Sequence, residues 1–142
     1  MRTALKRVEV YFAVHEWALA ESVILYVLDR GVKEAKRLVI KAGALQSIDR
    51  DIFLFAVQEL SKEYGIRVDE VELVIEDPVL KCNVCGYTWS VDLASLDEHV
   101  REAIHFLPEA VYAYLKCPNC SSVDFEIVRG RGLSEVLVEG RG

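Results

Sequence analysis

Two short segments, Cys82-Asn83-Val84-Cys85 and Cys117-Pro118-Asn119-Cys120, decide how this chain folds. They contain all four cysteines of the 142-residue sequence, and we call them the first and second knuckle. Two thiolates separated by two residues can turn back onto one cation, so the two knuckles supply the four sulfur ligands of a closed tetrahedral zinc site. Gly86, directly after the first knuckle, lets the backbone tighten around the sulfurs. The pattern predicts structural zinc, and the alternatives are two disulfides, a redox dithiol or a rubredoxin-like iron centre.

The length and composition are those of a small globular protein. A chain of 142 residues with 52% hydrophobic residues can form one domain, or a modest core plus a lobe held by metal. The sequence has no apolar run long enough to cross a bilayer and no secretory apolar region, so we expect a cytoplasmic protein. In that reducing compartment, cysteine pairs favour metal over disulfide. The net charge of −6 argues against a general nucleic-acid binder, which is usually basic.

Periodicity predicts four elements before the first knuckle. Apolar residues recur at three- and four-residue steps in 15–31 and again in 50–65, which indicates two helices. Residues 37–45 and 70–76 alternate as strands do, and Pro78 breaks the second run.

Smaller features refine these elements. Gly43 is expected to mark a bulge or a close approach, and Ser47 or Asp49 to cap the second helix. Residues 8–12 alternate briefly, which suits an edge strand within an appendage of residues 1–13. An extension outside the working fold is the alternative for this appendage.

The segment between the knuckles and the C-terminal segment complete the expected fold. Ser95-Leu96-Asp97-Glu98 matches a capping box and predicts a helix from Leu96 towards His105. Pro108 stops that helix, with another turn over 109–114. One last strand is expected to run from Phe125 through two glycines to Val138.

These elements predict an α+β fold. It has two helices with a small mixed three-stranded sheet, plus an inserted zinc-ribbon-like lobe. The expected division is an extension at 1–13, a first lobe formed by 14–80 and 122–142, and a zinc-binding lobe at 81–121.

Few residues outside the knuckles offer chemistry. His15-Glu16 is not the zinc-protease motif, because position 19 holds leucine instead of a second histidine. His105 lies beside Phe106 at a predicted helix end and is a candidate for a metal or a partner. Four sulfurs would close the zinc coordination sphere and leave no position for water or substrate, so we expect no catalysis there.

Taken together, these motifs resemble the HypA/HybF family of nickel-delivery metallochaperones that act in [NiFe]-hydrogenase maturation. The similarity runs from Val14 to about Glu139, and it is carried by His15 to Ala20, the strand end at Gly43, the two knuckles and the segment Arg129-Gly130-Arg131-Gly132. The long insert containing His105 resembles the archaeal branch of the family.

The resemblance implies which residues hold metal. It makes the four knuckle cysteines the zinc ligands and His15 the nickel imidazole, with Glu16 as a further nickel ligand or the neighbour that orients His15. The insert histidine His105 is a weaker candidate for nickel. Family members begin Met-His-Glu, and their N-terminal amine also binds nickel; here Val14 stands at the methionine position. Valine is what a conceptual translation writes for GTG, which prokaryotes also use as a start codon. We therefore hypothesise that the native chain begins at position 14.

Two other positions depart from the family. The family's Gly-Glu-Leu is here Gly43-Ala44-Leu45, and Ser121 follows the second knuckle where glycine is frequent.

The implied function is non-enzymatic. The chain would accept Ni²⁺, cooperate with a HypB-type nucleotide-hydrolysing protein and pass the metal towards the [NiFe]-hydrogenase large subunit. No membrane partner is expected, nucleic acid is disfavoured by charge, and the sequence leaves a homodimer open. The alternative function is a zinc-ribbon module that binds nucleic acid or a transcription partner.

Overall fold

The computed structural model describes the backbone of residues 2–45 and 48–140, and side chains from residue 15 onward within these ranges. The chain forms two compact units. Unit 1 comprises residues 1–40, 48–73 and 136–142, and unit 2 comprises 41–47 and 74–135. The unit that contains the knuckles is therefore larger than the expected lobe of residues 81–121.

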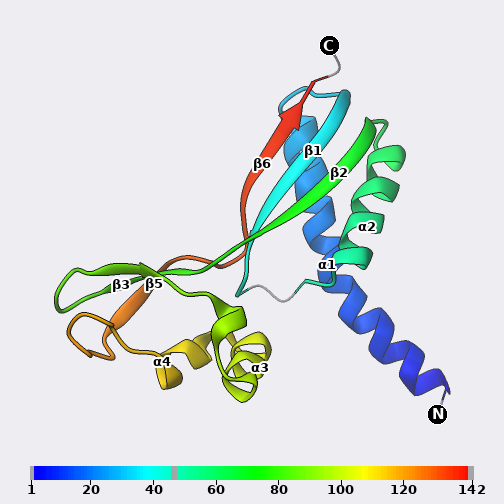
Figure 1. The fold of residues 1–142 in the computed structure, drawn as a ribbon. Coiled ribbons are helices and arrows are strands. Elements are labelled where there is room, and N and C mark those ends of the chain that lie inside the picture. Colours follow the sequence, from blue (N-terminus) through cyan, green and yellow to red (C-terminus); the bar gives the residue numbers. More distant parts are fainter. Residues whose placement is uncertain (1, 46–47, 141–142) are drawn as a thin grey trace. The chain divides into compact units, whose positions relative to one another are not determined.

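Helix α1 (Arg2–Asp29) is one continuous element, drawn in blue in Figure 1. The edge strand expected at residues 8–12 is wrong, because these residues continue the helix. Five alternating residues are too few to separate a strand from the first turns of a helix that propagates from a strongly helical segment. The apolar stripe that the periodicity predicted faces the core in the second half of α1. Ala20, Val23, Ile24 and Val27 are buried, and Leu19 and Leu28 at the edges of the stripe are half-buried.

A three-stranded sheet in the order β2-β1-β6 joins α1 in unit 1. Its strands are β1 (Glu34–Gly43), β2 (Arg67–Glu76) and β6 (Leu133–Glu139). Helix α2 (Arg50–Glu63) lies with α1 on one face of this sheet (Figure 1). Apolar side chains fill the layer between them, including Leu38, Ile40, Phe53, Ala56 and Val57, all with no exposed surface.

Asp49 caps helix α2. Its side chain accepts a hydrogen bond from the backbone N–H of Ile52 at 3.0 Å, which satisfies one of the free donors of the first turn. The alternative cap, Ser47, lies outside the described residues. Gly65 follows the helix with a φ of 76°, as expected for the residue that ends it.

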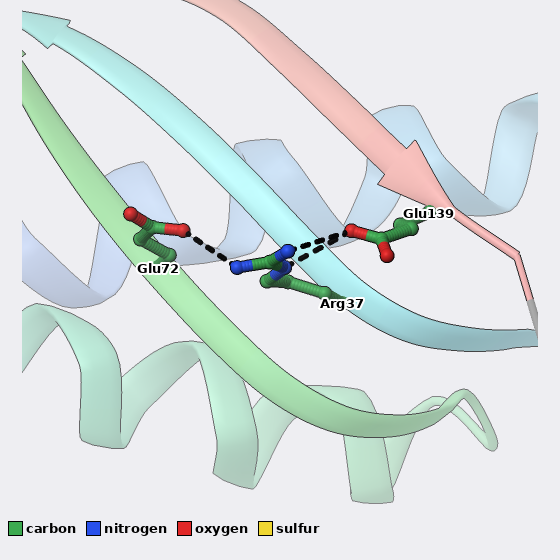
Figure 2. Close-up of polar contacts among 3 residues, drawn as sticks. All are labelled: Arg37, Glu72 and Glu139. Carbon is green, nitrogen blue, oxygen red and sulfur yellow. Dashed lines mark hydrogen bonds and ion pairs between the residues drawn. The ribbon is translucent and has the colours of Figure 1, made fainter.

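Charged side chains occupy the sheet face opposite the helices. Arg37 on β1 lies between Glu72 on β2 and Glu139 on β6 (Figure 2). Its guanidinium contacts Glu72 at 3.2 Å and Glu139 at 3.0 Å, and the hydrogen bond to Glu139 raises the pKa of Arg37. This arrangement links all three strands at an exposed surface.

Unit 2 contains a second three-stranded sheet, in the order β4-β3-β5. Strand β3 (Val79–Cys82) pairs antiparallel with both β4 (Thr88–Ser90) and β5 (Phe125–Arg129). Between the knuckles the chain forms the 3₁₀ turn η1 (Leu93–Ser95), helix α3 (Glu98–Phe106), the 3₁₀ turn η2 (Pro108–Ala110) and helix α4 (Val111–Tyr114). A core of seven buried side chains holds these elements together: Leu45, Leu80, Val91, Leu93, Ile104, Val111 and Phe125.

The prediction of a capping box at residues 95–98 is wrong. Ser95 belongs to turn η1, and its hydroxyl donates to the carbonyl of Asp92 at 2.7 Å. The N-cap of α3 is Asp97, which makes no side-chain capping bond. A capping box requires its serine at the N-cap, and here the 3₁₀ turn has shifted the helix start by two residues.

The prediction of one continuous C-terminal strand is also wrong. Strand β5 pairs with β3, whereas β6 lies beside β1 in the other sheet. Gly130 and Gly132, with φ values of 131° and 62°, separate the two strands. Both values lie in a region that L side chains rarely adopt, so the backbone changes direction there.

Gly43 marks a close approach, as predicted. A Cβ atom at this position would lie 2.1 Å from the backbone carbon and oxygen of Gly130. Two backbone bonds fix this crossing: Gly43 N–H donates to Gly132 O at 2.9 Å, and Leu45 N–H donates to Gly130 O at 3.1 Å. Within the described ranges, every helix is too short or too polar to cross a membrane.

Candidate metal centres

The two knuckles bring the four cysteine sulfurs of unit 2 together. All four Sγ atoms lie within 4.8 Å of one another. Cys82 and Cys120 are 3.5 Å apart and Cys85 and Cys117 are 3.7 Å apart, so each close pair joins one knuckle to the other. A tetrahedron with metal–sulfur bonds of about 2.3 Å has edges of about 3.8 Å, which matches these separations.

The sheet positions the knuckles from both sides. Cys82 is the last residue of β3, and Asn83 N–H donates to Asp124 O at 2.9 Å, which joins the first knuckle to the chain just before β5. Cys117 N–H donates to Ser122 O at 2.8 Å and closes the second knuckle. Ser121 within this turn has a φ of 65°. Glycine adopts this left-handed backbone more readily than serine does.

Hydrogen bonds to sulfur favour the thiolate form in the first knuckle. The backbone N–H of Cys85 at 3.5 Å and that of Val84 at 3.4 Å donate to the Cys82 sulfur and lower its pKa. Asn119 donates through Nδ2 to the Cys85 sulfur at 3.4 Å, and this bond lowers the pKa of Cys85 to about 6. The sequence pattern did not predict this role for Asn119, although its place inside the second knuckle was the available signal.

The fourth sulfur shows why the site needs a cation. The backbone N–H of Ser122 lowers the pKa of Cys120, but burial and the neighbouring cysteine sulfurs raise it to about 12. Four thiolates at this spacing repel one another, and a divalent cation removes that penalty. Four converging sulfurs with N–H donors in the surrounding shell therefore fit a structural zinc ion.

His15 and Glu16 lie in helix α1 of unit 1. His15 is exposed, whereas Glu16 retains only 6% of its accessible surface. Glu16 Oε1 accepts a hydrogen bond from the backbone N–H of Asp49 at 3.2 Å, which places the carboxylate at the N-terminus of α2. Among the described residues, Glu16 Oε2 is buried and has no hydrogen-bond partner. This contact with Asp49 could not be predicted from the sequence, because it joins positions 33 residues apart.

The two remaining candidates lie in different surroundings. Val14 falls inside helix α1, so its nitrogen is a peptide nitrogen in the chain as described. His105 is exposed in the last turn of α3, beside Phe106, whose side chain is 91% exposed. His105 belongs to unit 2 and His15 to unit 1.

Comparison with known proteins identifies the family. The family described as "Hydrogenase/urease nickel incorporation, metallochaperone, hypA" matches residues 14–138. The chain belongs to the HypA family. It is 41% identical to the hydrogenase maturation factor HypA of Pyrococcus furiosus over 139 residues, covering 91% of this chain and 99% of that protein. It is 44% identical to HypA of Pyrococcus horikoshii with the same coverage.

The fold is also that of solved HypA structures. The solution structure of the Ni metallochaperone HypA from Helicobacter pylori matches 89% of this chain and 98% of its own, with a TM-score of 0.55 and 19% sequence identity. This likeness supports the α+β architecture, in agreement with the sequence-based prediction. The HypA family match begins at residue 14, directly before His15-Glu16.

Proposed function

We propose that this protein is a nickel metallochaperone that delivers Ni²⁺ during the maturation of [NiFe]-hydrogenase. The observation that carries the proposal is the combination of an exposed His15 with a buried, anchored Glu16 at the start of the HypA match. The zinc-ribbon alternative, a module for nucleic acid or a transcription partner, is not favoured, since the family match covers residues 14–138 and the net charge is −6.

The proposed division of labour gives one metal to each unit. Cys82, Cys85, Cys117 and Cys120 hold structural zinc in unit 2, where a closed sulfur sphere resists exchange. Nickel is the cargo, and His15 supplies its imidazole from unit 1. Glu16 orients this end of α1, because one carboxylate oxygen is bonded to the Asp49 backbone. Its second oxygen is available for the nickel sphere, and His105 is the second choice for an additional ligand.

The complete nickel site needs an amine that an internal Val14 cannot provide. An N-terminal amine, the following amide and an imidazole close fused chelate rings, and nitrogen ligands of this kind favour square-planar nickel. We therefore propose that the nickel-competent form begins at position 14 with methionine in place of Val14. Residues 1–13 then fall outside that form. A chain that continues helix α1 through position 14 binds nickel through side chains alone, and binds it more weakly.

The proposed partners follow from delivery of a metal. A HypB-type nucleotide-hydrolysing maturation protein would exchange nickel with this chain, and the hydrogenase large subunit would receive it. Such partners work in the cytoplasm, and the chain itself catalyses no reaction.

The chain is either a monomer or a homodimer, and its elution volume in size-exclusion chromatography distinguishes the two.

Calorimetric titration with Ni²⁺ tests the nickel site. The full chain is compared with a chain that starts with methionine at position 14, both loaded with zinc. We expect stoichiometric binding by the shorter chain, weaker binding by the longer one, and none by the shorter chain carrying His15→Ala, with zinc content unchanged throughout. His99→Ala, which removes an exposed histidine of helix α3, is the matched control and should bind nickel as the parent does. Unaltered nickel binding by His15→Ala contradicts the proposal and makes His105 the next candidate.

A further inference from the structure

A concavity in unit 2 lies apart from the four cysteines in the sequence and from the proposed nickel residues. It has a volume of about 320 Å³ and is lined by the end of β5 and the turn that follows: Ile127, Val128, Arg129, Gly130, Arg131 and Ser134. Two arginine residues thus line one small concave surface, in a chain whose net charge is −6. The zinc site does not require a pair of arginines at this place.

A β-bulge shapes this concavity. On β3, the neighbours Val79 and Leu80 pair with Arg129 and Ile127 on β5, so Val128 is an extra residue without a partner on β3. A bulge of this kind bends the strand and re-aims the side chains beside it, and bulges are frequent next to functional sites. The bulge directly precedes Arg129.

The backbone that carries the two arginines is fixed. Gly130 O accepts from Leu45 N–H at 3.1 Å, and Gly132 O accepts from Gly43 N–H at 2.9 Å, so Arg131 is anchored on both sides. Gly130 is buried, and a Cβ atom there would lie 2.7 Å from Pro78 Cβ. A ligand that binds this turn therefore has little backbone to order, which lowers the entropic cost of binding.

The two guanidinium groups differ in the partners that they already have, since Arg131 interacts with the side chains of both Glu109 and Tyr112. Arg131 Nη1 donates to Glu109 Oε1 at 2.5 Å, and this is its only ion pair among the described residues. Arg129 makes no ion pair within the part of the chain that the structure describes. The Ser134 hydroxyl is already committed, since it donates to Glu76 Oε1 at 2.5 Å.

The number of guanidinium groups indicates the kind of anion that would bind. One guanidinium is sufficient for one carboxylate, as the Arg131–Glu109 pair shows. Two guanidinium groups that flank a fixed glycine match an anion with more than two oxygens, and arginine forks bind phosphate in this way. We propose that this concavity is a phosphate-binding site, in which Arg129 and Arg131 hold a phosphate group and Glu109 is the intramolecular competitor for Arg131.

Titration of the full, zinc-loaded chain with inorganic phosphate tests this site, followed by ¹H–¹⁵N NMR at constant ionic strength with chloride as the reference anion. We expect saturable shifts concentrated at the amides of residues 129–132. Arg129→Gln should weaken phosphate binding by about tenfold. The matched control is Arg67→Gln, which removes the same charge from an exposed position on β2 and should bind phosphate as the parent does. Equal binding by Arg129→Gln and Arg67→Gln, or shifts scattered over all basic residues, overturns the proposal.

A second pair of variants tests the competition with Glu109. Glu109→Gln frees Arg131 and should tighten phosphate binding, whereas Glu102→Gln removes an equally exposed charge from α3 and should not. The same gain in both variants indicates unspecific charge attraction and overturns the proposal. Titrations of the zinc-loaded chain with pyrophosphate and with adenosine triphosphate, without other added divalent cations, identify the source of the phosphate. Tighter binding of the nucleotide than of pyrophosphate indicates a nucleotide ligand, and the reverse order indicates free phosphate or diphosphate.

Discussion

Gly43→Ala is the substitution that the structure makes most informative. The added Cβ would lie 2.1 Å from the carbonyl carbon and oxygen of Gly130, whereas carbon atoms pack at about 3.5 Å or more. The two backbones must therefore separate by about 1.4 Å. That movement breaks or stretches the bonds from Gly43 N–H to Gly132 O and from Leu45 N–H to Gly130 O, which now measure 2.9 and 3.1 Å.

The expected cost combines overpacking and lost hydrogen bonds. Overpacking lowers the free energy of unfolding by about 1–3 kcal/mol, and each lost hydrogen bond lowers it by about 1 kcal/mol. Alanine also reduces the conformational entropy of the unfolded chain, which offsets about 0.5–1 kcal/mol of this loss. We expect a net loss of about 3 kcal/mol, which lowers the thermal midpoint of a chain of this size by roughly 6–12 °C.

Thermal unfolding followed by circular dichroism, with zinc in slight excess, measures the effect of Gly43→Ala. Gly140→Ala is the matched control, because a Cβ at that position has no atom within 4 Å, and its midpoint should stay within about 2 °C of the parent. If Gly43→Ala and Gly140→Ala have the same thermal midpoint, the close approach of the two backbones does not exist in solution and the reasoning is refuted.

Three further predictions concern unit 2. Cys117→Ser should abolish zinc retention, measured by atomic emission after dialysis, and should loosen unit 2 while unit 1 keeps its helical signal; simultaneous melting of both units would contradict this. Ile104→Ala empties a fully buried position in the core of unit 2 and should cost about 2–5 kcal/mol in urea unfolding, whereas Val84→Ala at an exposed position should cost little. The hydrogen bond from Arg131 lowers the pKa of Glu109, so this pair stabilises the fold above the ordinary carboxyl pKa, and the contribution is lost as the pH falls through the lowered value. The midpoint difference between the parent and Glu109→Gln should therefore be largest near neutral pH and vanish in acid; a difference that grows in acid would contradict the pairing.

Local sequence signals predicted the elements whose causes are local. The two knuckles predicted the sulfur cluster because a C-x-x-C turn is a local structure, and the apolar stripe predicted the buried face of α1. Pro78 and Gly65 ended their elements as expected, since each acts through its own backbone. The order of these local elements along the chain indicated the overall α+β fold.

The errors arose where a distant contact, or a competing local one, decides the structure. The sequence after Phe125 reads as one strand, but pairing with β3 and then with β1 divides it between two sheets. The segment from Ser95 to Glu98 matches the capping-box motif, but Ser95 is the last residue of the 3₁₀ turn capped by Asp92 and therefore cannot be the N-cap of the helix. The bond between Glu16 and the Asp49 backbone has no local signature at all. For the C-terminal strands and for Glu16 the partner lies outside the window that a motif or a period can sample, whereas Ser95 was lost to a competing local contact with Asp92, three residues before it.

The ligands explain how one small chain can keep one metal and release another. The proposed zinc site offers four sulfurs from two turns, with N–H donors from Val84, Cys85 and Asn119 supporting the thiolates. An ion held there would have no open position through which to exchange. The proposed nickel site has the opposite character. Its imidazole, on His15, is exposed, and its only buried member, Glu16, is anchored by one oxygen to the backbone of another helix. A partner can therefore approach the metal from solvent and replace ligands one at a time, while the anchored carboxylate keeps the site in place. Retention and release thus follow from the number and type of ligands that the fold fixes, and no conformational change is needed to account for the difference.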